Sequence, residues 1–181
     1  MSSAERREAV LDAAIAEFGV YGLHGATTEA IAKRVGITQP YIFRLYGSKK
    51  ELFLAAVERV CDRVIETWQA SLQAVREDAD PEERILAAGE AYAGLMGRRE
   101  ELLLLLQAFG ASKDPDVLRV SRRRLRQMYE YVQQATGASD ERMQRFFAHG
   151  MLLTVAAALD LPAIAGQEEW ADRFIGSKKG V

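Results

Sequence analysis

The side chains best suited to bind an extended anion are concentrated between Ala30 and Lys50. This stretch carries five basic residues and no acidic one, whereas the whole 181-residue chain has a formal net charge of -2. A slightly acidic protein does not coat nucleic acid indiscriminately, because such binding scales with the number of phosphates neutralised. The pattern therefore predicts a local surface for a polyanion such as DNA. The five residues are Lys33, Arg34, Arg44, Lys49 and Lys50.

Capping residues and glycines around these positions predict two short helices joined by a tight turn. Thr27 or Thr28 offers a side-chain oxygen to cap the first helix, and Gly36 ends it. Thr38 can cap the second helix, which tolerates Pro40 in its first turn because the missing amide would have no intrahelical acceptor there. This succession is the pattern of a helix-turn-helix.

The second of these helices is expected to have two different faces. Ile42 and Tyr46 share one face at i, i+4 spacing and can join a small core. The other face carries side chains that can read base edges, since glutamine pairs with adenine, arginine pairs with guanine and aromatic rings contact thymine methyls. These outward residues are Gln39, Tyr41, Phe43 and Arg44.

Phosphate contacts are predicted at the helix starts beside this face. Thr28 at one start, and Ser48 with Lys49 at another, combine free backbone amides, hydroxyls and positive charge. Such groups bind phosphate oxygens and fix the register of a protein on DNA without reading its sequence.

These residues bear a resemblance to a known family. The segment TTEAIAKRVGITQPYIFRLYGSKKELFLAAVE, which starts at Thr27, resembles the N-terminal signature of the tetracycline-repressor (TetR) family of transcriptional regulators. The resemblance implies DNA contacts by seven residues. They are Thr28, Gln39, Pro40, Tyr41, Phe43, Arg44 and Lys49.

The resemblance also implies a fold and a mode of action. It predicts an all-α, TetR-like protein of about nine helices, argued by analogy with the family. Residues 1–50 would form a three-helix helix-turn-helix domain, and residues 51–181 a helical effector-binding and dimerisation bundle. A homodimer would place two recognition helices on a palindromic operator, and a small apolar effector of unknown identity would release it. Repression is the action that the resemblance implies.

Capping signals predict further helices in the rest of the chain. Ser48 begins a Ser-Lys-Lys-Glu capping box, so a helix is expected from there to about residue 77. Asp-Pro pairs at residues 80–81 and 114–115 repeat the start signal. The leucine run at residues 102–106 would also fit a strand, but its helical neighbours favour a helix.

The helix expected over residues 139–161 is apolar nearly all round, so both of its sides must be buried. One side would meet its own domain and the other a second subunit related by a two-fold axis. Part of this helix, FFAHGMLLTVAAALDLP, resembles a late dimerisation helix of some bacterial members of the family. The residues expected at the dimer interface are Phe146, Gly150, Met151, Thr154 and Ala158.

A pocket for the effector is expected in the middle of the second domain. Methionines and aromatic residues at helical spacing are more often plain core, so both interpretations stay open for each position. The candidate lining residues are Trp68, Leu72, Met96, Leu103, Phe109, Met128, Tyr129 and Phe147.

The sequence disfavours several other classes of protein. Cys61 is the only cysteine and His24 and His149 are the only histidines, so neither an intramolecular disulfide nor a Cys/His zinc site is expected. No glycine-rich phosphate loop or nucleophile elbow supports an enzyme, and no cofactor is expected. The charged N-terminus lacks the apolar core of a signal peptide, and no apolar stretch is long enough to span a bilayer. A soluble, cytoplasmic protein without a membrane partner is therefore expected.

Two alternatives stay open at this point. The arginine-rich run over residues 119–126 could be a second nucleic-acid site, although a basic run on a helix is usually a solvated face. The whole chain could also be a helical protein-interaction module that never touches DNA. That interpretation leaves the acid-free basic stretch and its outward aromatic residues without an explanation.

Overall fold

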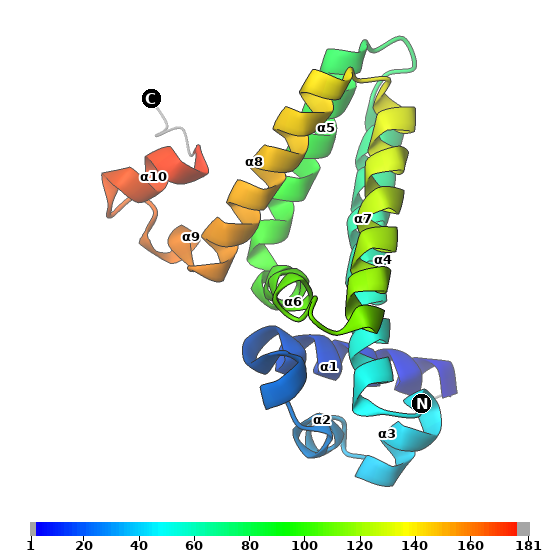
Figure 1. The fold of residues 1–181 in the computed structure, drawn as a ribbon. Coiled ribbons are helices and arrows are strands. Elements are labelled where there is room, and N and C mark those ends of the chain that lie inside the picture. Colours follow the sequence, from blue (N-terminus) through cyan, green and yellow to red (C-terminus); the bar gives the residue numbers. More distant parts are fainter. Residues whose placement is uncertain (1–2, 177–181) are drawn as a thin grey trace. The chain divides into compact units, whose positions relative to one another are not determined.

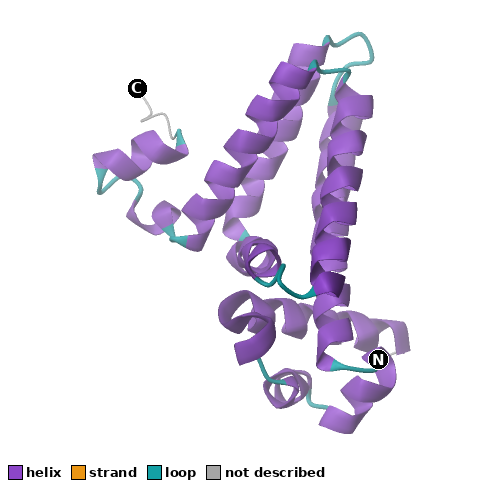
Figure 2. Ribbon diagram, in the orientation of Figure 1, coloured by secondary structure: helices purple, strands orange, loops and turns teal. Residues whose placement is uncertain are grey.

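In the computed structural model, residues 3–176 are described, and they form helices joined by short loops without any β-strand (Figure 2). The predicted all-α fold is confirmed, with ten α-helices and one 3-10 helix in the described part of the chain. In chain order (Figure 1) the elements are α1 (Ser3–Gly25), α2 (Thr28–Val35), α3 (Gln39–Tyr46), α4 (Lys49–Ala74), α5 (Pro81–Ala93), η1 (Gly94–Gly97), α6 (Arg99–Gly110), α7 (Pro115–Thr136), α8 (Asp140–Ala158), α9 (Leu161–Ile164) and α10 (Glu169–Ile175).

The chain packs as two compact units. The first holds the chain up to Arg63 together with Leu103–Arg126, and the second holds Val64–Leu102 together with the chain from Gln127 onward. Helices α4, α6 and α7 therefore each contribute residues to both units. The division after residue 50 stays a prediction, placed where the helix-turn-helix ends and α4 begins.

The first unit has a small apolar core that holds the short helices α2 and α3. Ile31 of α2 and Ile42 of α3 are completely buried. Phe18 of α1 and Phe53 of α4 are buried as well, and their rings meet edge to face with 5.1 Å between the centroids. Edge-to-face pairs add stabilisation beyond the apolar area that they bury. Helices α1, α2 and α3 and the first part of α4 therefore pack around one core.

The predicted caps account for the ends of these helices. Thr27 caps α2, since its hydroxyl accepts a hydrogen bond from the amide of Ala30 at 3.1 Å. Gly36 ends α2 with a φ of 73°, a left-handed conformation that glycine adopts without strain. Thr38 occupies the N-cap position of α3, but its side chain makes no capping hydrogen bond. Within α1, Gly22 breaks the helical geometry with a φ of 67°.

The second unit is built around Trp68 of α4, which is only 1% exposed. Asp80 caps α5 by accepting from the amide of Glu83 at 2.9 Å, as the Asp-Pro signal predicts.

The leucine run lies in α6, so the helical interpretation is correct. Among residues 3–176, no helix is both long and apolar enough to cross a membrane.

Candidate nucleic-acid interface

Helix α3 has the two faces that the sequence predicts. Ile42 and Tyr46 are buried, with 0% and 8% of their surface exposed. Phe43 is 39% exposed and Arg44 is exposed, while Gln39 and Tyr41 are half-buried. A helix of eight residues thus turns one apolar side into the first unit and presents an amide, two aromatic rings and a guanidinium on the other.

Thr28 and Gln39, two of the predicted DNA contacts, are bonded to each other. The Nε2 of Gln39 donates to the Oγ1 of Thr28 at 2.6 Å, and Thr28 is only 4% exposed. Thr28 therefore orients the Gln39 amide rather than presenting its own hydroxyl to solvent. Because the Gln39 side chain is already held in one rotamer, it would lose less conformational entropy on binding a ligand.

Tyr41 and Arg44 lie against each other on the exposed side of α3. The Cζ of Arg44 stands 4.6 Å from the centroid of the Tyr41 ring, within the range of a cation–π contact. Pro40 is exposed in the first turn, where its missing amide breaks no helical hydrogen bond. The exposed side of α3 is thus partly organised by contacts within the chain.

Ser48 and Lys49 make contacts within the first unit. The Ser48 hydroxyl accepts from the amide of Glu51 at 3.1 Å and so caps α4, as the capping box predicts. The ammonium of Lys49 donates to the carbonyl oxygens of His24 and Ala26, both at 3.2 Å. These are carbonyls at the end of α1, where a cation is favourable. Lys49 therefore fixes the α1–α2 connection as well as carrying charge.

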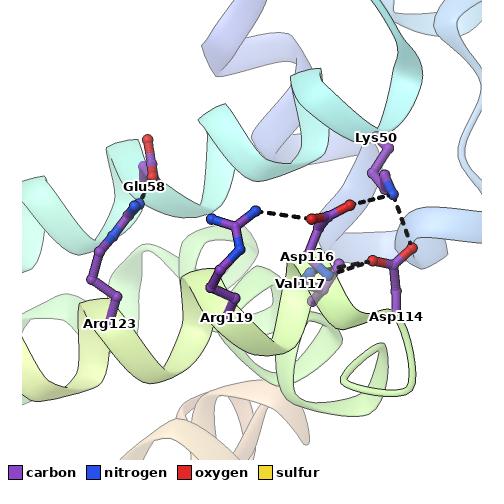
Figure 3. A network of polar contacts seen from close by, with 7 residues as sticks. All are labelled: Lys50, Glu58, Asp114, Asp116, Val117, Arg119 and Arg123. Carbon is purple, nitrogen blue, oxygen red and sulfur yellow. Dashed lines mark hydrogen bonds and ion pairs between the residues drawn. The ribbon is translucent and has the colours of Figure 1, made fainter.

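Lys50, the last basic residue of the acid-free stretch, is held by two carboxylates from another part of the first unit. Figure 3 shows its ammonium between Asp114 and Asp116, at 3.4 Å and 2.7 Å from their nearest oxygens. Asp116 also accepts from Arg119 at 2.9 Å. The hydrogen bond from Lys50, followed by that from Arg119, holds the pKa of the Asp116 carboxyl below its usual range. We call Lys50, Asp114, Asp116 and Arg119 the α4–α7 clamp.

The arginine-rich run of α7 is largely ion-paired inside the first unit. Arg123 pairs with Glu58 of α4 (Figure 3), and Arg124 pairs with Asp62 one turn further along α4. These contacts favour the interpretation of the run as part of a packed, ion-paired helix face. Cys61 of α4 is buried, and burial raises the pKa of its thiol, which fits a small apolar core residue.

Two residues that the sequence did not single out bind backbone groups of the helix-turn-helix. Arg7 of α1 donates to the carbonyl of Leu45 at 3.3 Å, and its guanidinium lies 4.6 Å from the ring centroid of Tyr46. Glu17, only 7% exposed, accepts from the amide of Thr27 at 3.3 Å. An acid on the inner face of an otherwise amphipathic helix is a signal that could have identified Glu17. Nothing local marks Arg7, because its partners are nearly forty residues away.

The residues predicted to line an effector pocket are distributed over both units. Leu103 and Phe109 belong to the first unit, and Phe109 is 38% exposed. In the second unit Trp68, Tyr129 and Phe147 come together, with centroid distances of 6.4 Å for Trp68–Phe147 and 5.5 Å for Tyr129–Phe147. Leu72 and Met128 are buried and Met96 is half-buried in that unit.

Two aromatic residues complete this group and were not predicted to belong to it. The rings of Tyr92 and Phe146 lie 6.1 Å and 5.7 Å from that of Trp68. The indole Nε1 of Trp68 is buried without a hydrogen-bond partner. We call Trp68, Tyr92, Tyr129, Phe146 and Phe147 the aromatic cluster. The spacing of single helices could not show it, because its members come from α4, α5, α7 and α8.

The residues predicted for a dimer interface lie on different sides of α8. Met151 is 43% exposed, whereas Thr154 is 2% exposed and its hydroxyl pairs with that of Tyr92 at 2.7 Å. Gly150 faces the same ring, since a Cβ there would lie 3.6 Å from it. Phe146 belongs to the aromatic cluster, and Ala158 is half-buried. Three of these positions thus contact groups of their own subunit.

The comparisons with known proteins agree with this geometry. Residues 10–56 match the family model for "Bacterial regulatory proteins, tetR family". The HTH-type transcriptional activator FasR of Mycolicibacterium smegmatis is 36% identical over 88 residues, which make up 49% of this chain but only 39% of FasR. The similarity to this relative is therefore restricted to part of its length.

Solved structures extend the similarity over nearly the whole chain. A TetR-like transcriptional regulator from Rhodococcus sp. RHA1 is 26% identical, with a TM-score of 0.63 over 97% of this chain and 87% of that one. A regulator from Saccharomonospora viridis, solved in complex with choline, has a TM-score of 0.72 at 19% identity, over 96% of this chain and 93% of that one. The latter similarity shows the fold alone.

A short exposed helix after a tight turn, followed by a helical second unit, defines the class of helix-turn-helix transcriptional regulators. Within that class, residues 10–56 match the model of the TetR family, and the chain shares its fold with a TetR-like regulator.

The α4–α7 clamp gives the stability of the protein a defined dependence on acid. Because the pKa of Asp116 is lowered by folding, its contribution is complete above the unfolded pKa of about 3.9 and is lost as the pH falls through the lower folded pKa. We expect Asp116→Asn to be less stable than wild type at pH 6, and this difference to shrink as the pH falls below the unfolded pKa of about 3.9. Urea unfolding across that range measures it. Curves that stay equally far apart at every pH would contradict the clamp, and the Lys50→Gln background should reduce the difference at pH 6.

Proposed function

We propose that this chain binds double-stranded DNA and reads it with α3. The observation that carries the proposal is the division of α3, in which Ile42 and Tyr46 are buried. On its other side Phe43 and Arg44 are exposed, and Gln39 is half-buried. Gln39 suits adenine and Arg44 suits guanine, and Phe43 offers an apolar surface to thymine methyls. Pro40 and Tyr41 complete this surface, and Ser48 and Lys49 add a hydroxyl and a positive charge at the start of α4 for nearby phosphates.

We further propose that it acts as a homodimer on a palindromic operator. The exposed side of α8 carries an apolar stripe at i, i+3, i+4 and i+7 spacing, and a second copy of the chain would cover it about a two-fold axis. Two recognition helices related by that axis would enter successive major grooves about 34 Å apart. The stripe consists of Ala148, Met151, Leu152, Val155 and Leu159.

A small effector is proposed to act through the second unit. The aromatic cluster offers ring faces and one buried donor, the Nε1 of Trp68, which lacks a partner. A ligand can release DNA only if it favours a conformation that binds DNA less well, and the two binding events then weaken each other equally. The Saccharomonospora viridis neighbour was solved with choline, so small-molecule binding occurs in a protein of this fold.

Repression is the action proposed, because a dimer on an operator blocks other proteins from the same DNA. FasR is described as an activator, so the relatives do not fix the sign of regulation. The relatives are regulators, which supports a function without catalysis. The alternative of a helical interaction module without DNA binding predicts no retention on DNA at any salt concentration.

The reading face is tested by selecting random duplex DNA with the purified chain and titrating the enriched sequence. The double variant Gln39→Ala, Arg44→Ala should lose about 2–6 kcal/mol, roughly thirtyfold or more in affinity, because each bidentate base contact contributes about 1–3 kcal/mol. Arg76→Ala removes an exposed arginine of the second unit and should bind as wild type does. Enrichment of no sequence, or equal binding by the double variant, would favour the interaction module.

The dimer is tested at Met151, whose exposure allows substitution without disturbing its own subunit. Met151→Glu would bury a carboxylate at the interface, so we expect dimerisation to weaken by about 2 kcal/mol or more, roughly thirtyfold. Sedimentation velocity over a concentration series measures this. Leu86→Glu places the same charge on an exposed leucine of α5 and should leave the dimer intact. Identical sedimentation of both variants would exclude this face.

The effector site is tested with tryptophan fluorescence. The chain has two tryptophans, so Trp170→Phe leaves Trp68 as the single reporter. Small molecules are first selected for their ability to release DNA from this variant. We expect every such compound to change the emission of Trp68, and to bind less tightly, by the same factor, when DNA is present. A compound that releases DNA without changing the emission would place the effector site outside the aromatic cluster.

A further inference from the structure

Tyr41 on the reading helix lies beside two arginines that come from different helices. Arg44 belongs to α3 itself, and its Cζ is 4.6 Å from the ring centroid. Arg6 belongs to α1, and its Cζ is 5.7 Å from the same centroid. The Arg6 guanidinium, chiefly through hydrogen bonding to the phenol, lowers the pKa of Tyr41. The start of α1 thus reaches the exposed side of α3.

The two cations beside Tyr41 differ from several arginines of the first unit that are held by carboxylates. Arg59 and Arg63 pair with Glu8, and Arg123 pairs with Glu58. Within residues 3–176, by contrast, neither Arg6 nor Arg44 has a carboxylate partner. Two positive charges that share one ring without a counterion repel each other, and an anion supplied from outside would relieve that repulsion.

The neighbouring residue Arg7 has a different environment. Its guanidinium donates to the carbonyl of Leu45 at 3.3 Å and lies over the ring of the buried Tyr46. Arg7, although exposed, is therefore engaged with the end of α3. Arg6, one position earlier, is directed toward the half-buried Tyr41 on the reading side. The two arginines carry the same charge in adjacent positions but have different partners.

We propose that Arg6 is part of the DNA-binding surface, where its guanidinium contacts a backbone phosphate and holds the Tyr41 ring in place. This inference rests on the proposed DNA-binding function and extends the interface from the helix-turn-helix to the first turns of α1. Arginine suits both roles, because its planar group stacks on a ring while its remaining donors stay available for phosphate oxygens. Donation into the Tyr41 hydroxyl also strengthens that group as a donor to a neighbouring phosphate.

The salt dependence of DNA binding distinguishes a phosphate contact from a structural one. With the enriched duplex, Arg6→Gln should reduce the magnitude of the negative slope of log affinity against log salt by about 0.9, and reduce affinity by about five- to tenfold near 0.1 M salt. The loss should be the same for the enriched and for unrelated duplexes, since a phosphate contact carries no sequence information. Arg6→Lys keeps the charge and should restore the slope.

Arg7→Gln is the matched control, because it removes the same charge one residue away. Its urea unfolding midpoint should fall, while the salt slope stays that of wild type. If Arg6→Gln leaves the slope unchanged, or if both variants reduce it equally, the specific role of Arg6 is refuted. These outcomes require wild-type chain that binds the enriched duplex. Failure of the wild type to bind any duplex would instead refute the proposed function and this inference with it.

Discussion

The reading helix depends on the burial of two side chains. Helices of fewer than about twelve residues are marginal in water, because the cost of nucleation is spread over too few hydrogen bonds. The eight residues of α3 therefore stay helical because Ile42 and Tyr46 are buried in the core that Ile31 shares. The common direction of the exposed side chains of α3 depends on this anchoring. If the core were loosened, the exposed side chains would lose their common direction along with their helix.

Charge in the first unit is divided between internal and external uses. Lys49 and Lys50 carry charge in the acid-free stretch, yet Lys49 bonds carbonyls at the end of α1 and Lys50 lies between Asp114 and Asp116. Both therefore stabilise the arrangement of helices around α3. Arg6 and Arg44, which have no carboxylate partner among the described residues, remain available to an external anion. Net charge over a segment thus overstates the charge that a ligand meets.

The apolar residues of helix α8 lie in two different environments. Its inner side supplies Thr154 to the hydroxyl of Tyr92 and Phe146 to the aromatic cluster. Its outer side leaves Met151 and Leu159 exposed, at 43% and 65%. A polar hydroxyl on the inner side is possible because it donates to the carbonyl of Gly150 and pairs with Tyr92. The same helix thereby serves the core of one unit and an open surface.

The sequence by itself determined the helical class, the starts of several helices and the two faces of α3, because these depend on neighbours three or four residues away. Thr27, Gly36, Ser48 and Asp80 act at such distances, and so do the faces of α3. Only the tertiary structure decided that Thr28 orients Gln39 and that Thr154 faces inward. Only packing likewise assembled the aromatic cluster from four helices. Contacts between residues far apart in the chain depend on how helices pack. The periodicity of a single helix shows which of its faces is apolar, but not which other helix will cover that face.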